Sequence, residues 1–127
     1  MQLNQALAVM LGGALGALAR YATSAYFSQF KSGLYVYPIA TLSVNVVGCF
    51  LLSLLVFSTL SNVSPTLKLA LGTGFLGALT TFSTFEVETL QLTELGWLAA
   101  LGYVLVSVGL GFGAVLLGRW LALLLNS

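Results

Sequence analysis

The chain has 127 residues, of which 59% are apolar and only 6% are charged. Because an ordinary soluble domain carries about 25% charged residues, this composition excludes such a domain and indicates a protein embedded in a membrane. With a formal net charge of +1 and no histidine, the chain offers no electrostatic footprint for nucleic acid. It also lacks the commonest acid–base residue and metal ligand.

Four apolar segments are each long enough to cross a bilayer, which takes about 20 residues. We therefore expect an all-α membrane protein with a single four-helix transmembrane domain over residues 1–127. No basic residue precedes the first segment, so we interpret it as a retained membrane helix rather than a cleaved signal peptide. Pro65 is expected in the first turn of the third helix. The spans are expected at residues 3–25, 38–60, 67–92 and 97–125.

The basic residues are divided evenly between the two sides of the membrane. Four spans place both termini on one side. Arg20 and Lys31 then belong to the side of the first and third loops, and Lys68 and Arg119 to the opposite side. Because the Lys/Arg bias sets orientation, two interpretations stay open. The chain has one weakly specified topology, or it has dual topology, in which it inserts both ways and the copies pair antiparallel.

Small residues recur at a spacing of four in the first and fourth spans. Such patterns let helices approach closely, and they predict tight packing within the chain or between chains. The patterns are Gly12-x-x-x-Gly16, Gly109-x-x-x-Gly113 and Ala114-x-x-x-Gly118.

Two polar residues interrupt the first and second spans. Arg20 either extends its guanidinium to the membrane interface or lines a water-filled vestibule, where it raises the local anion concentration. Asn45 lies mid-span and shares a helix face with Thr41 and Gly48. Its amide either bonds to a neighbouring helix or presents an NH₂ donor to a pore.

The third span contains an unusually polar stretch, Gly77-Ala-Leu-Thr-Thr-Phe-Ser-Thr-Phe-Glu86. Each glycine weakens a helix by about 1 kcal/mol relative to Ala. Thr80, Thr81 and Ser83 are all good N-cap residues, and the segment from Ser83 to Glu86 fits a capping box. The span either breaks near residues 77–81 and restarts, or continues with its hydroxyls bonded one turn back. A break would expose carbonyls that can coordinate a cation and a helix N-terminus that favours an anion.

Aromatic and hydroxyl side chains follow this stretch at helical spacing. Phe82 and Phe85 share a helix face. They either direct their positive ring edges at an anion path or are packing residues. In the fourth span, Tyr103 and Ser107 form one aligned polar pair.

Three acids, Glu86, Glu88 and Glu94, cluster at the end of the third span. The simplest expectation is that they are solvated acids at a helix end. Glu86 and Glu88 are two residues apart and point to different faces, so an inward, hydrogen-bonded Glu88 is the alternative.

These residues together resemble a known family, the CrcB/Fluc family of bacterial fluoride channels. The resemblance covers essentially the whole chain and its four-span layout, and the motif in the third span is its most specific part. It is carried by Gly12 to Arg20 (GGALGALAR), Thr41 to Gly48 (TLSVNVVG), Gly74 to Phe85 (GFLGALTTFSTF), Glu88 and Tyr103-x-x-x-Ser107.

The resemblance implies a broken third helix and an antiparallel, dual-topology homodimer with two fluoride pathways. It implies that the backbone carbonyls of Gly77 and Thr80 hold a Na⁺ ion at the dimer interface, and that Arg20 lies in a vestibule. Thr41 and Glu88 are implied as structural or pore-end positions. The implied fluoride pathway consists of Asn45, Phe82, Ser83, Thr84, Phe85, Tyr103 and Ser107.

Three positions depart from the family pattern. Ala78 stands where a second glycine is usual, which puts the carbonyl geometry of the ion site in question. Glu86 stands where a small polar residue is common, and Gly111 where Ser or Thr often continues the polar track. None of these departures removes a central feature.

We therefore expect a passive, selective channel that exports fluoride across the bacterial plasma membrane and relieves fluoride toxicity. No nucleophile–base pair or metal constellation suggests an enzyme. One alternative is a proton-coupled small multidrug transporter, which needs an intramembrane carboxylate, but the first span has no acid. The other is a structural membrane subunit, in which Asn45, Phe82 and Phe85 only pack.

Overall fold

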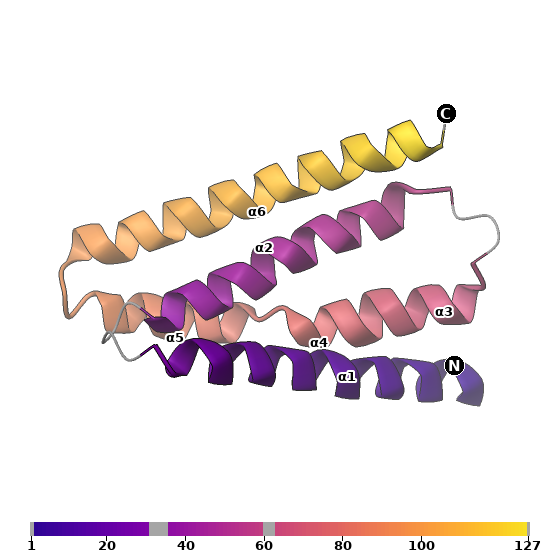
Figure 1. Ribbon diagram of the computed structural model, residues 1–127, viewed down its shortest axis with the longest axis horizontal. Coiled ribbons are helices and arrows are strands. Elements are labelled where there is room, and N and C mark those ends of the chain that lie inside the picture. Colours follow the sequence, from indigo (N-terminus) through magenta and orange to yellow (C-terminus); the bar gives the residue numbers. More distant parts are fainter. Residues whose placement is uncertain (1, 31–35, 60–62, 127) are drawn as a thin grey trace.

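The computed structural model describes residues 2–30, 36–59 and 63–126. These residues form four helical rods, the third of which is assembled from short pieces (Figure 1). The all-helical fold and the broken third helix are therefore confirmed. Lys31 and Leu60, the predicted end of the second span, lie outside the described residues. The elements are α1 (Leu3–Ser28), α2 (Val36–Phe57), α3 (Pro65–Leu69), the π-helix η2 (Ala70–Leu76), α4 (Gly77–Leu79), α5 (Phe82–Leu92) and α6 (Trp97–Leu125).

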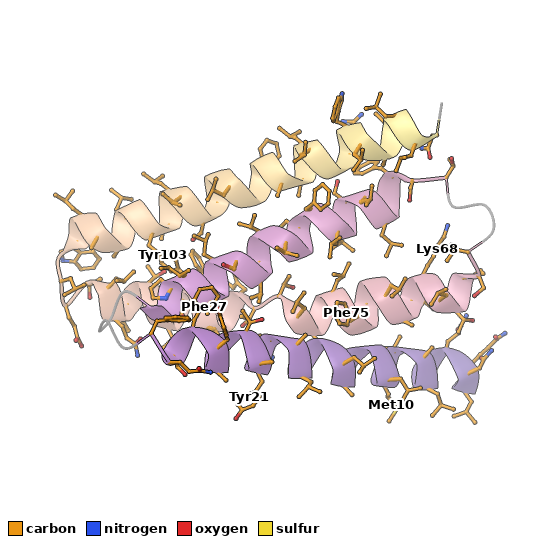
Figure 2. The ribbon with its side chains drawn as sticks, viewed as in Figure 1. Met10, Tyr21, Phe27, Lys68, Phe75 and Tyr103 are labelled. Atoms are coloured by element: carbon orange, nitrogen blue, oxygen red, sulfur yellow. The ribbon has the colours of Figure 1, made fainter. Side chains whose placement is uncertain are left out.

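The four rods lie side by side along one long axis (Figure 1). The third rod packs mainly against α1 through η2, and α2 packs mainly against α6. Both chain ends lie at the same end of the bundle, and Lys68 lies at that end as well (Figures 1 and 2). Leu3–Ser28, Pro38–Phe57 and Trp97–Leu125 are each long and apolar enough to cross a membrane as a single helix. The third rod runs alongside them in pieces (Figure 1).

The third rod begins as the sequence predicts. Ser64 is the N-cap of α3, and its hydroxyl accepts a hydrogen bond from the Leu67 N–H at 3.2 Å. Pro65 occupies the first turn, where its missing N–H costs nothing. The helix then widens into the π-helical segment η2, a rare geometry that often occurs near functional sites.

Glycines bring η2 into backbone contact with α1. A β-carbon on Gly12 would collide with the carbonyl of Ala70, and one on Gly16 would collide with the carbonyl of Phe75. Gly74 faces the backbone of α1 from the other side of the same contact. This interface is a contact between two main chains, so the predicted close packing at Gly12 and Gly16 is confirmed within one chain.

The small residues of α6 divide into two groups. Gly118 packs directly on the α2 backbone at Phe50. By contrast, a β-carbon added at Gly109 or Gly113 would meet nothing within 4 Å in the described part of the chain. The Gly109–Gly113 pattern therefore makes no intrachain helix contact in this part of the structure, and its contact with a second chain stays a prediction.

Polar groups join α2 to α6 at the end of the bundle that carries the termini. The Ser53 hydroxyl donates to the Val115 carbonyl at 2.7 Å. The Asn126 side chain accepts from the Thr59 N–H at 2.8 Å and donates to the Phe57 carbonyl at 3.0 Å. Asn126 thereby caps the C-terminal end of α2, where helix carbonyls lack intrahelical donors.

Candidate functional site

The break in the third rod lies at two threonines. Thr80 (φ −77°, ψ 153°) and Thr81 (φ −150°, ψ 117°) are extended, so α4 ends at Leu79 and α5 begins at Phe82. Thr81 is the N-cap of α5, and its hydroxyl accepts from the Thr84 N–H at 3.2 Å. The predicted capping box from Ser83 to Glu86 is therefore wrong. The helix restarts two residues earlier because the Thr81 hydroxyl already satisfies the orphan N–H group of the first turn.

The Asn45 amide of α2 pairs with the backbone of Thr81. Its Oδ1 accepts from the Thr81 N–H at 2.8 Å, and its Nδ2 donates to the Thr81 carbonyl at 3.0 Å. The Asn45 oxygen thus replaces the acceptor that a continuous helix would have supplied to the Thr81 N–H. Its nitrogen adds a donor to the Thr81 carbonyl, which as the N-cap carbonyl also begins the bonding of α5. The interpretation in which Asn45 bonds to a neighbouring helix is confirmed, and its partner is the break itself.

Two carbonyls beside the break lose their usual donors. In an α-helix, the carbonyl of residue i accepts from the N–H of residue i+4. For Gly77 that donor is Thr81, whose N–H is bonded to Asn45. For Thr80 it is Thr84, whose N–H is bonded to the Thr81 hydroxyl. Side-chain oxygens therefore take the N–H donors that would otherwise bond to the Gly77 and Thr80 carbonyls. These are the two carbonyls that were predicted to be cation ligands.

One face of α2 contacts the third rod at three successive levels. Thr41 donates to Glu88 of α5, and Asn45 clamps Thr81 at the break. Gly48 provides the space for the Thr80 side chain, because a β-carbon there would collide with the Thr80 methyl group. The three residues that were predicted to share a helix face thus position α5, the break and the end of α4.

Glu88 is a buried acid with two hydroxyl donors. The Thr41 hydroxyl donates to Oε1 at 2.7 Å and the Tyr103 hydroxyl to Oε2 at 2.9 Å. The residue is 6% exposed, so the expectation of a solvated helix-end acid is wrong for Glu88, whereas Glu86 is exposed. The two bonds tie α2 and α6 to α5, and Figure 2 shows Tyr103 where these elements meet.

An open groove of about 320 Å³ runs along the break, and we call it the aromatic groove. The Phe82 and Phe85 ring centroids lie 5.8 Å apart, and those of Phe85 and Tyr103 lie 5.3 Å apart. Phe85 is 7% exposed, whereas Phe82 is 73% exposed at the surface of the chain. The lining comprises Asn45, Gly48, Cys49, Leu52, Leu76, Gly77, Thr80, Thr81, Phe82, Phe85, Ser107, Val108 and Gly111.

Ser107 contributes an unusual hydroxyl to this groove. Its Oγ is buried and finds no hydrogen-bond partner of good geometry within the described ranges. Buried hydroxyls normally have partners, because desolvation without one costs about 1–3 kcal/mol. Gly111, one turn further along α6, also lines the groove, and a β-carbon added there would make an ordinary contact of 3.7 Å with the Cys49 sulfur.

A second hollow of about 290 Å³, which we call the arginine pocket, lies between α1, α2 and the start of α5. Arg20 is half-buried in its lining, eight residues or about 12 Å before the end of α1. Thr41, Thr81 and Thr84 supply hydroxyls to the same pocket. Thr81 lines both hollows, so the break separates them by one residue.

The structure gathers most of the predicted site around the break. Asn45, Phe82, Phe85 and Ser107 line the aromatic groove with Gly77 and Thr80, and Arg20 and Thr84 line the arginine pocket. Tyr103 lies behind Phe85, and Ser83 is exposed with its hydroxyl 3.4 Å from that of Thr81.

Two residues of this site were not predicted to belong to it. Cys49 was not among the predicted site residues, yet it lines the groove one turn after Asn45. Thr81 was considered only as a cap, and its spacing along the chain gave no sign that its backbone pairs with Asn45. The i, i+4 relation between Asn45 and Cys49 was the one available signal, because it places both on one face of α2.

The family described as "CrcB-like protein, Camphor Resistance (CrcB)" matches residues 7–119 of the chain. This chain belongs to the CrcB family. The matched region contains the break, the aromatic groove and the arginine pocket, so every element of the site lies inside the family's shared sequence.

Relatives from distant bacteria give the same assignment. "Fluoride-specific ion channel FluC" of Saccharophagus degradans is 46% identical over 114 residues, which cover 86% of this chain and 82% of the relative. The protein of that name from Shewanella sp. strain ANA-3 is 44% identical over 122 residues, covering 94% and 96%. "Fluoride-specific ion channel FluC 2" of Listeria monocytogenes is 45% identical over 113 residues, covering 87% and 84%. The CrcB assignment therefore holds over most of the chain's length.

Proposed function

We propose that this protein is a passive, fluoride-selective channel of the bacterial plasma membrane, a multi-pass membrane protein and not an enzyme. The observation that carries the proposal is the clamped break between two hollows, in a chain 44–46% identical to proteins named fluoride-specific ion channels. Across an inside-negative membrane, each exported anion gains about 2.3 kcal/mol per 100 mV. Export therefore needs no other energy source.

The groups around the break suit a small anion. Fluoride is strongly hydrated, so a pore must replace its water with hydrogen-bond donors. The aromatic groove offers the Ser107 hydroxyl, which has no partner of good geometry among the described residues, and the remaining N–H of the Asn45 amide. Its aromatic rings present positive edges. No carboxylate is among the described residues that line either hollow, which favours an anion over a cation.

We place the pathway from the arginine pocket across the break into the aromatic groove. Arg20 attracts the anion, and the hydroxyls of Ser83 and Thr84 replace its water at the entrance. Phe82 and Phe85 then direct their ring edges toward the ion, and Ser107 donates beyond them. Thr81 lines both hollows, which supports a single connected path. Tyr103 keeps Phe85 in place through ring contact, and its hydroxyl anchors Glu88.

A second copy of the chain, packed antiparallel, completes each pathway in this proposal. Irregular backbone at membrane depth must be covered by protein or line a cavity, because lipid cannot satisfy its polar groups. Gly77, Phe82, Ser83 and Thr84 are nevertheless exposed in the single chain. The balanced Lys/Arg count supports dual topology, since it gives neither orientation an advantage.

A Na⁺ ion between the two copies fits the residues at the break. Hard cations prefer oxygen ligands, and the Gly77 and Thr80 carbonyls have lost the donors that would compete for them. When bound, the ion would neutralise the carbonyl dipoles and hold the two copies together. Ala78 stands where the family usually has glycine. This departure does not restore the lost donors, because the Thr81 and Thr84 N–H groups remain bonded to side-chain oxygens.

A proton-coupled transporter is less well supported by this structure. Such a mechanism needs an intramembrane carboxylate that exchanges its proton with the pathway. Glu88 is the buried acid of the described residues, and both of its oxygens already accept hydroxyl bonds. It also lies outside the lining of both hollows.

Fluoride efflux from liposomes that contain the purified protein tests the proposal. With K⁺ and valinomycin balancing the charge, fluoride should leave at the same rate when a protonophore removes any pH gradient. If efflux stops when the pH gradient is removed, the protein is a proton-coupled transporter and the channel proposal is wrong. Absence of fluoride efflux would leave a structural subunit as the explanation.

A further inference from the structure

We infer that Asn45 is a positioning residue for the cation site, because its amide frees the Gly77 carbonyl from the helix. The inference rests on the proposed Na⁺ site and adds a role for a residue whose placement alone suggests only a donor to the anion path. Its basis is the reciprocal pair of bonds, 2.8 Å and 3.0 Å long, between the Asn45 amide and the Thr81 backbone.

The alternative conformation of the break defines what Asn45 prevents. If Thr81 became helical, its N–H would point back along the rod and donate to the Gly77 carbonyl. That carbonyl would then accept a helix hydrogen bond and would be less available to an ion. In the structure, the Thr81 N–H leaves the rod sideways and reaches Asn45 on α2. One side-chain oxygen therefore decides whether the Gly77 carbonyl is bonded to the Thr81 N–H or left free.

The amide is suited to this task because it both accepts and donates. Its oxygen takes the Thr81 N–H, which would otherwise be unsatisfied in the membrane, and its nitrogen returns a hydrogen bond to the Thr81 carbonyl. Both bonds together fix the orientation of the amide plane. At most one N–H of Asn45 remains for an anion.

Packing beside Asn45 favours the same open state. Gly48, one turn later on α2, accommodates the Thr80 methyl group, which a larger residue would exclude. Thr80 in turn remains anchored to the end of η2, since its N–H and its hydroxyl both donate to the Leu76 carbonyl, at 3.1 Å and 3.0 Å. The helix thus ends at Leu79, the Thr80 N–H keeps the last helix hydrogen bond, and the Thr81 N–H is the first to leave the rod for Asn45.

Thermal unfolding of the purified protein in detergent, titrated with Na⁺ against choline at constant ionic strength, tests the inference without using ion flux. A ligand that binds only the folded state raises its stability by mass action. Asn45→Ala lets the break become helical in most molecules. The apparent affinity for Na⁺ is then the intrinsic affinity multiplied by the small fraction of molecules whose break stays open. The Na⁺ concentration for half-maximal stabilisation should therefore rise about tenfold or more.

Ser53→Ala is the matched control on the same helix. It removes a buried hydrogen bond from α2 to the Val115 carbonyl, two turns from Asn45. It should lower the unfolding temperature equally in Na⁺ and in choline, with the half-maximal Na⁺ concentration unchanged. If Asn45→Ala does not fold, Asn45→Leu fills a similar volume without either bond and should show the same loss of Na⁺ affinity.

An unchanged half-maximal Na⁺ concentration in the folded Asn45 variant overturns the inference. Combined with lost fluoride efflux, it would leave Asn45 as a pore amide only, and the channel proposal would stand. If the unsubstituted protein gains no stability from Na⁺, the cation site fails and the inference fails with it. Fluoride efflux from the same preparation then decides separately whether the channel proposal survives.

Discussion

The third rod is held on its two sides by different kinds of contact. Against α1, the glycines at 12, 16 and 74 bring two backbones together, and the fit is purely steric. Against α2, the contact depends on the side chains of Thr41 and Asn45, and both hollows open beside it. The α1 side fixes where the rod lies. The α2 side replaces helix hydrogen bonds and leaves backbone groups and space available to ions.

The largest effect is expected where the steric side is disturbed. Gly12→Ala places a methyl group against the Ala70 carbonyl, so α1 and η2 must separate. Overpacking typically costs about 1–3 kcal/mol of folding free energy. The cost should lie at the upper end of this range, because the obstructing group is a backbone carbonyl and cannot move aside as a side chain can. We expect little folded protein, measured as monodisperse material after purification in detergent.

Gly13→Ala is the control for this substitution. A β-carbon there would lie 3.9 Å from the Gly74 carbonyl, which is an ordinary contact. It should give the normal yield. Equal yields from both variants would mean that the α1 contact is looser than the structure indicates.

The second effect concerns transport on the polar side. Phe82→Ile removes an exposed ring from the aromatic groove and should not disturb the core, because Phe82 is 73% exposed. An aromatic contact is worth about 0.5–1.5 kcal/mol, so fluoride efflux should fall about tenfold while the protein stays folded. Phe85→Ile should also reduce efflux, but Phe85 is buried against Tyr103 and its loss mixes transport with stability.

Phe30→Ile controls for the general loss of an exposed ring. Phe30 is 54% exposed at the end of α1 and lines neither hollow. Its efflux should match that of the unsubstituted protein. Normal efflux in both Phe82→Ile and Phe85→Ile would show that the aromatic rings are not part of the fluoride pathway.

The smallest effect is expected at the buried acid. Tyr103→Phe leaves the Glu88 Oε2 without its hydroxyl donor. Polar pairs between membrane helices are worth about 0.6–2 kcal/mol, so we expect destabilisation of about 1 kcal/mol, measured by denaturant titration in mixed micelles. Tyr26→Phe removes an exposed hydroxyl instead and should change nothing. A Tyr103 variant as stable as the Tyr26 variant would contradict the anchoring role of Glu88.

Parts of this comparison could be predicted from the sequence. Glycines and threonines in the third span predict a break as one of two alternatives, because local helix propensity is low there and N-cap residues follow. Pro65 marks the start of the same rod. These features depend on residues within one or two turns of each other, and such short-range physics is visible in a sequence.

Other parts depend on contacts between distant segments. Asn45 and Thr81 are 36 residues apart, so the sequence left the amide's role open between a neighbouring helix and a pore. The capping box failed because Ser83 and Thr81 are both suitable caps, and tertiary pairing selects Thr81. Glu86 and Glu88 differ only in helix face, and the hydroxyls of Thr41 and Tyr103 determine which one is buried.

The ratio of fluoride to chloride efflux from the same liposomes tests the central claim most directly. Both ions are loaded together, valinomycin sets the potential and the pH is equal on both sides. Hydrogen-bond donors and ring edges around a narrow break should pass fluoride and retain chloride, so the account predicts fluoride efflux with chloride at the level of protein-free liposomes. Comparable efflux of both ions, or none of fluoride, would contradict it.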